Sequence, residues 1–285
     1  MKAVIVGAGG QLGRSLLMTV PPGAVVASFD RGALDICDRA RVAAVVAAEA
    51  PDVVFNAAAY TAVDEAEREA AQAHAINTTA VRHLADAARD VTAHFVHVST
   101  DFVFGGHSGV PYAPDAPTGP LGQYGRTKLA GEHAAGPEAL IVRTAWLYAP
   151  TGHNFVRTML RAMRERSQVR VVADQVGTPT YAIGLAHALW KLAARGARGI
   201  FHYTDSGVAS WYDFAVAIQE EALAAGLLER AVPIVPIKTA DYPTLAERPP
   251  YSVLDTQSTS AMLGDPAPHW RVQLRVMIEA IKADG

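Results

Sequence analysis

The chain has 285 residues, of which 50% are hydrophobic and 19% are charged. Its 25 lysines and arginines against 28 aspartates and glutamates give a net charge of -3, which excludes the basic field typical of nucleic-acid-binding proteins. Its apolar runs fall short of the ~20 residues that a membrane helix needs and of a signal peptide's core. The single cysteine, Cys37, cannot form an internal disulfide, and we expect a buried, inert thiol. We therefore predict a cytoplasmic protein with neither nucleic acid nor membrane as a partner.

An apolar strand, a glycine-rich turn and a helix open the chain. The strand is predicted over residues 3–6, and Gly7, Gly10 and Gly13 follow it with the spacing GxxGxxG. The stricter GxGxxG pattern fails, because Leu12 stands where its last glycine would fall. Small residues let a pyrophosphate approach the backbone, and the helix N-terminus attracts anions. Strand, turn and helix together predict a dinucleotide site that includes these glycines.

The second predicted strand, over residues 24–29, ends at Asp30 and Arg31. An acidic residue at this point binds the ribose hydroxyls of NAD, whereas an arginine nearby binds the extra phosphate of NADP. Both residue types are present, so the pattern leaves NADPH and NADH open as cofactors. A solvated loop charge is the alternative interpretation of Arg31.

Strands and helices continue to alternate through the first half of the chain. The predicted elements are a helix over 38–50 capped by Asp38, a strand over 53–55, one or two helices over 66–88, a strand over 95–98, a helix through 124–132 and a strand over 140–143. This alternation is typical of a doubly wound parallel sheet. Ligands of such sheets bind at the carboxyl ends of the strands, where three alanines, a Ser-Thr-Asp sequence and a tryptophan follow the predicted strands. These residues are Ala57, Ala58, Ala59, Ser99, Thr100, Asp101 and Trp146.

Tyr124 and Lys128 are four residues apart in a predicted helix, which places both side chains on one face. A lysine ammonium close to a tyrosine favours the phenolate and should lower the tyrosine pKa. Such a tyrosine exchanges a proton at a substrate oxygen. A surface pair on a helix is the alternative that this spacing alone leaves open.

The second half of the chain shows a looser pattern. We predict helices over 154–165, 211–224 (capped by Ser210) and 272–281, and short strands over 170–173 and 200–203. The predicted fold is therefore α/β, of Rossmann type: a sheet in residues 1–150 with late elements near 170–205, and a smaller, interleaved substrate-binding lobe mainly in 151–285. We expect Trp190 and Trp211 in the core, and Glu65, Glu67 and Glu69 on a solvated helix surface.

Several longer strings of the sequence carry a family resemblance. They are GGQLG from Gly9, LDI from Leu34, NAAAYTAVDEAE from Asn56, STDFVF from Ser99, YGRTKLAGE from Tyr124, RTAWLY from Arg143, DQVGTPT from Asp174 and RPPYSVLD from Arg248. Across essentially its whole length the chain resembles the extended short-chain dehydrogenase/reductase superfamily and, more closely, its dTDP-4-dehydrorhamnose reductase family. The glycine turn and YxxxK mark the superfamily, whereas the longer strings are specific to the narrower family.

The resemblance implies an enzyme that uses NADPH or NADH to reduce the C4 keto group of a nucleotide sugar, dTDP-4-dehydro-L-rhamnose. By the same resemblance, Thr100, Tyr124 and Lys128 are catalytic, and Lys128 also binds the cofactor ribose. The implied cofactor contacts include Gly10, Gln11, Leu12, Asp35, Ile36, Ala57, Ala58, Ala59 and Tyr60. The implied substrate contacts are Val63, Thr100, Asp101, Trp146 and Arg248, the last one at the nucleotide diphosphate.

Other functions stay open at this point. They are reduction or epimerisation of another deoxy-sugar nucleotide, and a non-catalytic, NADP-binding regulatory subunit. Family members that dimerise through magnesium carry a glutamate at the position of Ser15, so we expect no metal, and a homodimer remains compatible with the sequence. Asp64 fits either a substrate contact or a helix N-cap.

Overall fold

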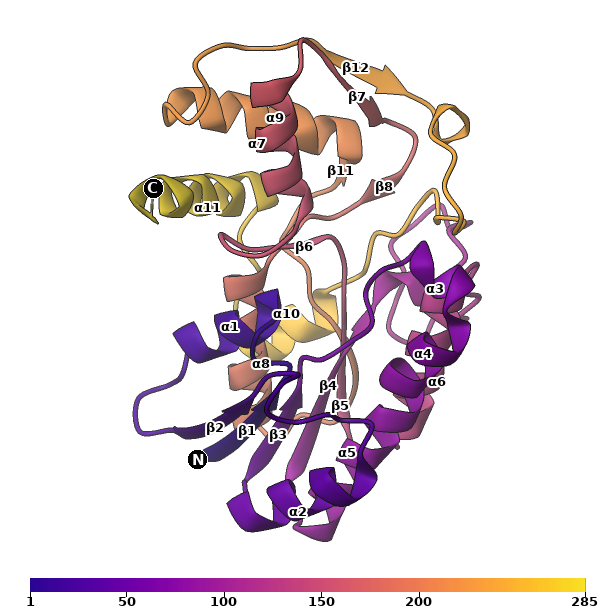
Figure 1. Ribbon diagram of the computed structural model, residues 1–285, viewed down its shortest axis with the longest axis vertical. Helices are drawn as coiled ribbons and strands as arrows, with labels where there is room; N and C mark the ends of the chain where they lie inside the picture. Colours follow the sequence, from indigo (N-terminus) through magenta and orange to yellow (C-terminus); the bar gives the residue numbers. More distant parts are fainter. Residues whose placement is uncertain (285) are drawn as a thin grey trace.

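The computed structural model describes residues 1–284, and within them six parallel strands form one sheet (Figure 1). In spatial order the strands are β10 (Gly199–His202), β5 (Leu140–Thr144), β4 (His94–Thr100), β3 (Val53–Asn56), β1 (Lys2–Val6) and β2 (Val25–Phe29). Each neighbouring pair is parallel. The predicted doubly wound parallel sheet is thus confirmed.

Helices cover both faces of this sheet (Figure 1). One face packs on α1 (Gln11–Met18), α8 (Ala182–Ala194) and α10 (Gln257–Leu263). The other face packs on α2 (Arg39–Glu49), α5 (Ala80–Asp90) and α6 (Gln123–Ala135). Asp38 caps α2 as predicted, since its carboxylate accepts a hydrogen bond from the Arg41 N–H at 3.0 Å.

The segment predicted as one or two helices over residues 66–88 is divided more finely. Ahead of α5 lie α3 (Glu65–Arg68), α4 (Ala70–His74) and a π-helical turn, η1 (Ala75–Thr79). Such turns are frequent at functional sites. This one directs the buried Asn77 towards Tyr60 and Thr127, to which its amide donates hydrogen bonds of 3.1 and 3.2 Å. η1 thereby connects the segment after β3 with α6.

The order of the strands places the switch point between β1 and β3. The chain moves from β1 to β2 on one side and then crosses back to β3 on the other, which opens a crevice at the carboxyl ends of β1 and β3. The glycine turn lies there: Gly7 has φ +77°, and a Cβ atom on it would lie 2.5 Å from the backbone nitrogen of Ala58. A Cβ atom on Gly13 would lie 2.2 Å from the carbonyl oxygen of Gly7. These two positions require glycine because backbone approaches backbone.

A second apolar core fills a lobe beyond these strand ends, at the top of Figure 1. Its elements are α7 (Phe155–Glu165), α9 (Trp211–Ala224), α11 (Trp270–Asp284), and the pairs β7 (Val169–Val172) with β12 (Ile234–Ile237), β8 (Val176–Gly177) with β11 (Ala209–Ser210) and β6 (Leu147–Tyr148) with β9 (Thr180–Tyr181). Ser210 caps α9 as predicted: its hydroxyl oxygen accepts the Asp213 N–H, and the Asp213 carboxylate accepts the Ser210 N–H in return. Short 3-10 turns complete the chain: η2 (Asp101–Val103) and η3 (Thr239–Asp241).

The two late strands predicted near residues 170–205 have different positions. β10 joins the main sheet beside β5, whereas β7 pairs with β12 inside the lobe. β7 alternates between buried and partly or fully exposed residues, as a strand covered on one side does, while β5 is buried throughout. No helix among residues 1–284 combines the length and the hydropathy needed to cross a membrane.

Candidate active site

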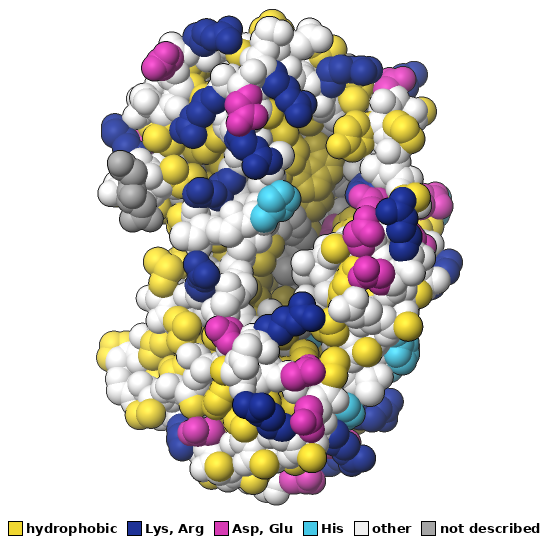
Figure 2. All heavy atoms as spheres, viewed as in Figure 1, with side chains coloured by type: hydrophobic (Ala, Val, Ile, Leu, Met, Phe, Trp, Pro, Cys, Tyr) yellow, Lys and Arg dark blue, Asp and Glu magenta, His cyan; other side chains and the backbone are white. Residues whose placement is uncertain are grey.

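A hollow separates the sheet domain from the lobe (Figure 2). Within it lies a cavity of about 510 Å³, here called the reaction cavity, to which the carboxyl ends of β3, β4 and β5 all contribute. Predicted site residues from distant parts of the chain line it together: Gly10, Gln11, Leu12, Ala57, Ala58, Ala59, Val63, Thr100, Asp101, Tyr124, Lys128, Trp146 and Arg248. These residues thus lie at one edge of the sheet, as expected for the ends of parallel strands.

Tyr124 lies in the first turn of α6, and its ring meets Phe102 edge-on at a centroid distance of 5.6 Å. Burial raises the pKa of Tyr124 to about 12, and the negative charge of Asp101 acts in the same direction, while a contact with the Thr100 hydroxyl opposes both. The expectation that Lys128 lowers this pKa is therefore wrong, because burial outweighs any such effect. At neutral pH the Tyr124 hydroxyl keeps its proton and is available as a donor.

Lys128 is buried one turn further along α6, with only 2% of its surface exposed. Its ammonium donates a 2.6 Å hydrogen bond to the carbonyl oxygen of Val98, on β4. Burial lowers the Lys128 pKa to about 8, although the nearby Glu132 carboxylate raises it in part. Glu132 is itself held by two hydrogen bonds from the buried Arg143 guanidinium, at 2.9 and 2.7 Å. A lysine with a depressed pKa in a cavity is typical of an active site.

Thr100 ends β4, Asp101 follows it at the start of η2, and both are buried. The Thr100 hydroxyl donates to Asp101 Oδ1 at 3.0 Å and accepts from the Phe102 N–H at 3.2 Å. Burial raises the pKa of Asp101 to about 6. Among the residues that the structure describes, its Oδ2 finds no hydrogen-bond partner of normal geometry, although the Ser252 hydroxyl is close enough to lower that pKa. Asp101 thus orients the Thr100 hydroxyl and keeps one oxygen free.

Trp146 forms the wall of the cavity between the sheet and the lobe. It has φ +46°, a left-handed conformation that is strained for an aromatic residue. Its ring stacks on Trp211 at 3.5 Å, and a Cβ atom on Gly177 would lie 2.7 Å from it. Strain of this kind is concentrated at functional sites. Trp211 is a site residue that the sequence analysis missed: it packs against the lobe's core but also lines the reaction cavity.

A longer cleft of about 730 Å³ runs from the glycine turn past the end of β2. Its lining includes Gly7, Gly10, Asp30, Arg31, Asp35, Ile36, Ala57, Ala58, Ala59 and Tyr60, all predicted cofactor contacts. Small residues and a helix N-terminus at one end, and partly apolar walls at the other, fit the pyrophosphate and adenosine of a dinucleotide. Gly13 does not line this cleft; it lets α1 pack against the turn.

Three polar residues of this cleft, Asp30, Arg31 and Cys37, differ in their hydrogen bonds and exposure. The Asp30 carboxylate accepts hydrogen bonds from the Gly32 and Ala33 N–H groups, both at 2.9 Å, whereas Arg31 is exposed. Cys37 also lines the cleft and is exposed, so the prediction of a buried thiol is wrong. The residue follows the buried Ile36 in an irregular loop, where its side chain points away from the core.

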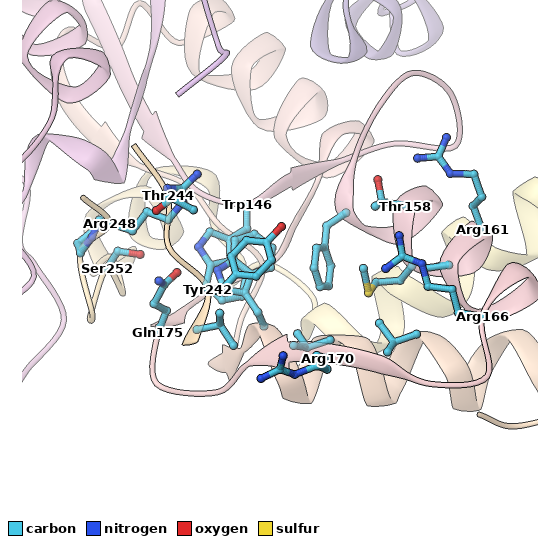
Figure 3. A pocket seen from close by; sticks show the side chains of 18 of the residues that line it. Trp146, Thr158, Arg161, Arg166, Arg170, Gln175, Tyr242, Thr244, Arg248 and Ser252 are labelled. Carbon is cyan, nitrogen blue, oxygen red and sulfur yellow. The ribbon is translucent and has the colours of Figure 1, made fainter. Parts of the chain in front are cut away.

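A second cavity, of about 390 Å³ and here called the lobe cavity, adjoins the reaction cavity (Figure 3). Phe102, Trp146, Trp211 and Arg248 line both. Arg161, Arg166 and Arg170 add positive charge around its rim, and Phe155 and Tyr242 add aromatic surface. An aromatic and cationic cavity of this kind suits a nucleotide.

Around α3, the prediction of a solvated Glu67 and the N-cap alternative for Asp64 are wrong. Glu67 is not merely solvated, because its Oε1 accepts a 2.7 Å hydrogen bond from the N–H of Gln123, at the start of α6. Asp64 makes no N-cap hydrogen bond to α3 and instead binds Arg248 through both carboxylate oxygens, at 3.1 and 2.7 Å. Both partners are more than fifty residues away, and no local pattern indicates them. By contrast, Trp190 lies in the core as predicted.

Comparison with known proteins now identifies the family. The family profile described as "RmlD substrate binding domain" matches residues 1–283. This chain belongs to the dTDP-4-dehydrorhamnose reductase family. It is 40% identical to the dTDP-4-dehydrorhamnose reductase of Aggregatibacter actinomycetemcomitans, over 96% of this chain and 97% of that protein.

Solved structures of family members agree with this fold. A dTDP-4-dehydrorhamnose reductase from Clostridium acetobutylicum superposes with a TM-score of 0.93 at 37% identity, over 99% of this chain and 100% of that one. The Bacillus anthracis enzyme, solved in complex with NADP, gives 0.92 at 35% identity, over 98% of this chain and 99% of that one. Within residues 1–284, no three histidine, cysteine, aspartate or glutamate side chains converge in a way that could hold a metal ion.

Proposed function

We propose that this protein reduces the C4 keto group of dTDP-4-dehydro-L-rhamnose to give dTDP-L-rhamnose, with NADPH or NADH as the reductant. The observation that carries the proposal is the reaction cavity, which brings Thr100, Tyr124 and Lys128 together beside the glycine turn. The chain's membership of the reductase family supports the substrate, and the NADP in the Bacillus anthracis relative supports the cofactor.

The bound nicotinamide cofactor supplies the hydride for C4. The chain provides a cradle for it: Gly7, Gly10 and Ala58 keep the crevice open to backbone level, and the N-terminus of α1 favours the pyrophosphate. Asp35 and Ile36 line the far end of the cleft, which we assign to the adenine.

Tyr124 donates the proton that the reduced C4 oxygen requires. Its pKa of about 12 keeps the hydroxyl protonated at neutral pH, which suits a reductase. The Thr100 hydroxyl donates its one hydrogen to Asp101 Oδ1. When substrate binds, that hydrogen turns to the same C4 oxygen and stabilises it as its negative charge develops. The buried Lys128 ammonium stabilises the phenolate that remains when the Tyr124 proton has left.

The two parts of the chain divide the remaining tasks. We assign cofactor binding mainly to residues 1–150, with the late strand β10 completing their sheet, and substrate binding mainly to the lobe in residues 151–285. The sugar lies in the reaction cavity near Val63, Asp101 and Trp146, and the nucleotide enters the lobe cavity. Arg248 lines both cavities, where the diphosphate between sugar and nucleoside must pass.

The test is turnover of dTDP-4-dehydro-L-rhamnose with each cofactor, followed by identification of the product by NMR. The wild type should oxidise one cofactor per sugar, and Tyr124→Phe should lower kcat by about 10²–10⁴-fold because the proton donor is lost. Tyr212→Phe, in α9 and outside both cavities, is the matched control. Turnover by Tyr124→Phe near the wild-type rate would contradict the assignment. Cofactor binding without turnover would instead indicate a regulatory subunit, and interconversion without net cofactor oxidation an epimerase.

We further propose that the protein works in the cytoplasm as a homodimer. Apolar side chains on α11 support a second copy, since Val272 and Val276 are 52% and 49% exposed. Light scattering of the purified protein distinguishes the dimer from a monomer, and cell fractionation tests the location.

A further inference from the structure

A segment of the lobe contributes to the lining of both cavities. Residues 242–252, here called the strap, run from the end of η3 to the bridges that join Tyr251 to Val176. A Cβ atom on Gly106 would lie 2.6 Å from Pro250, so the strap lies directly on the loop after β4. Strap residues supply part of the lining of the lobe cavity: Tyr242, Thr244, Arg248, Pro249 and Ser252 (Figure 3).

Asp64 binds the strap from the sheet domain. Its Oδ1 accepts from Arg248 Nη1 at 3.1 Å, and its Oδ2 from Arg248 Nη2 at 2.7 Å. Oδ1 also accepts from the backbone N–H of Ala246 at 3.0 Å, while Arg248 Nη1 donates to the Ala246 carbonyl at 2.9 Å. One carboxylate thus fixes both the side chain and the backbone of the strap, 184 residues away in the chain.

This contact differs from an ordinary surface ion pair. The Arg248 and Asp64 side chains are 23% and 36% exposed, and their contact is bidentate. By comparison, Arg68 and Glu65, on adjoining α3, share a single 3.5 Å contact and are 63% and 51% exposed. Hydrogen bonding by Arg248 also lowers the pKa of Asp64, in agreement with a carboxylate that stays charged. Exposed pairs such as Arg68–Glu65 contribute little, whereas a bidentate, partly buried pair fixes geometry.

The hydrogen bonds to Asp64 and Ala246 use only part of the Arg248 guanidinium. Arginine has five N–H donors, and within residues 1–284 acceptors are found for two at Nη1 and one at Nη2. The Nε–H and the second Nη2 hydrogen lie on a side chain that lines both cavities. A nucleotide sugar that spans them must place its diphosphate at this junction.

The segment that carries Asp64 also contacts the catalytic helix. Val63 lines the reaction cavity, and Glu67 accepts the N–H of Gln123, next to Tyr124. Two carboxylates three residues apart therefore connect this segment to its neighbours: Asp64 binds the strap, and Glu67 binds the start of α6.

We propose that Asp64 is a positioning residue, which holds Arg248 and the strap in place so that the free guanidinium donors meet the diphosphate of the nucleotide sugar. This inference rests on the proposed function. Asp64 itself touches neither the sugar nor the cofactor, so its removal should weaken substrate binding and leave the hydride and proton transfers intact.

The test compares Asp64→Asn, Arg248→Gln and the double variant with Glu65→Gln as the matched control on the same segment. Loss of one charge-assisted contact should raise KM for dTDP-4-dehydro-L-rhamnose by about 10–100-fold in Asp64→Asn. Its kcat at saturation and its KM for NADPH should stay within about twofold of the wild type, a split that a general loss of structure would not give. Because Asp64 acts through Arg248, the double variant should be no worse than Arg248→Gln alone. Glu65→Gln should match the wild type.

Calorimetric binding of dTDP to the same proteins separates this inference from the proposed function. Weaker dTDP binding by Asp64→Asn, abolished as an effect in the Arg248→Gln background, supports the positioning role whether or not the wild type turns over the sugar. An unchanged KM and dTDP affinity in Asp64→Asn would overturn the role of Asp64. Additive effects in the double variant, or an equal rise of KM for NADPH, would overturn it too.

Discussion

Tyr124 and Lys128 share one face of α6, but burial shifts their pKa values in opposite directions. Removal from water disfavours a charged group, so the tyrosine keeps its proton more firmly and the lysine loses its proton more easily. The pKa values are about 12 and about 8. The two shifts leave a neutral acid beside a cation at neutral pH, which is the state that reduction of a ketone requires.

The Lys128 pKa gives a prediction for the dependence of activity on pH. The ammonium is present below about pH 8 and is lost as the pH rises through that value. Because the cation stabilises the Tyr124 phenolate, kcat/KM for the sugar should be constant on the acid side and fall above about pH 8. The measurement is the pH profile of kcat/KM. A profile that stays flat from about pH 6 to about pH 10 would contradict the role given to Lys128.

We predict that Arg31 sets the preference between NADPH and NADH. Asp30 already accepts two backbone N–H groups, whereas the exposed Arg31 lines the cofactor cleft. If Arg31 binds the extra phosphate of NADP, Arg31→Ala should raise KM for NADPH by about 10–100-fold and leave KM for NADH unchanged. Steady-state kinetics with both cofactors check this, with the exposed Arg39→Ala on α2 as the control. Equal changes for the two cofactors would show that Arg31 does not read the phosphate.

Site residues at strand ends could be predicted from the sequence, because parallel strands bring their carboxyl ends to one edge. Thr100, Ala58 and Trp146 meet in this way. The partners of Asp64 and Glu67 could not be predicted, because those contacts depend on how the strap and α6 pack. Nor could the raised pKa of Tyr124, since burial depends on the whole fold.

α6 approaches its neighbours at backbone distance. A Cβ atom on Gly131 would lie 2.1 Å from the carbonyl oxygen of Asn77 in η1, and one on Gly125 would lie 2.2 Å from that of Phe102 in η2. Because a backbone segment cannot shift without disturbing its own hydrogen bonds, these glycines allow α6 to take the position that places Tyr124 and Lys128.

Gly131→Ala should therefore destabilise the protein by about 1–3 kcal/mol, through overpacking, and lower kcat as α6 is displaced. Chemical denaturation and steady-state kinetics measure the two effects. Gly109→Ala is the matched control, because a Cβ atom there meets nothing within 4 Å. If both variants unfold at the same denaturant concentration, the close approach of α6 does not contribute to the free energy of unfolding.

Regular elements were predictable where apolar periodicity and capping residues agree, as in α2 with Asp38 and α9 with Ser210. The pairing of β7 with β12 was not, since a short strand carries no signal for its partner. The same holds for η1, whose π-helical turn depends on the buried Asn77 and its contacts with Tyr60 and Thr127.

At the scale of the whole molecule, a buried carboxyl lies where the two cores meet. Asp205, 2% exposed, accepts the Tyr181 N–H at 3.0 Å, and burial raises its pKa to about 8. Tyr148 and Tyr181 belong to the core of the lobe, and Tyr203 to a core of the sheet domain. The burial of Asp205 therefore depends on how the lobe packs against the sheet.

The raised pKa of Asp205 makes the free energy of unfolding depend on pH. Between its ordinary value of 3.8 and about 8, the folded state binds more protons than the unfolded state, so stability falls as the pH rises through this window. Asp205→Asn removes this cost and should stabilise the protein by up to about 5 kcal/mol near pH 8, and by much less near pH 4. Thermal denaturation at the two pH values measures the difference. An equal effect at both would contradict the burial of a protonated Asp205.

The central claim is that hydride moves from a nicotinamide in the glycine-turn cleft to the C4 atom of a sugar held against Thr100 and Tyr124. It is tested most directly with NADPH that carries deuterium at both nicotinamide C4 positions and dTDP-4-dehydro-L-rhamnose, with the product analysed by NMR. One deuterium is expected at sugar C4 of the dTDP-L-rhamnose, and its formation should be slowed by about 10²–10⁴-fold in Tyr124→Phe. Product without deuterium at C4, or no product while the protein binds NADPH, would contradict it.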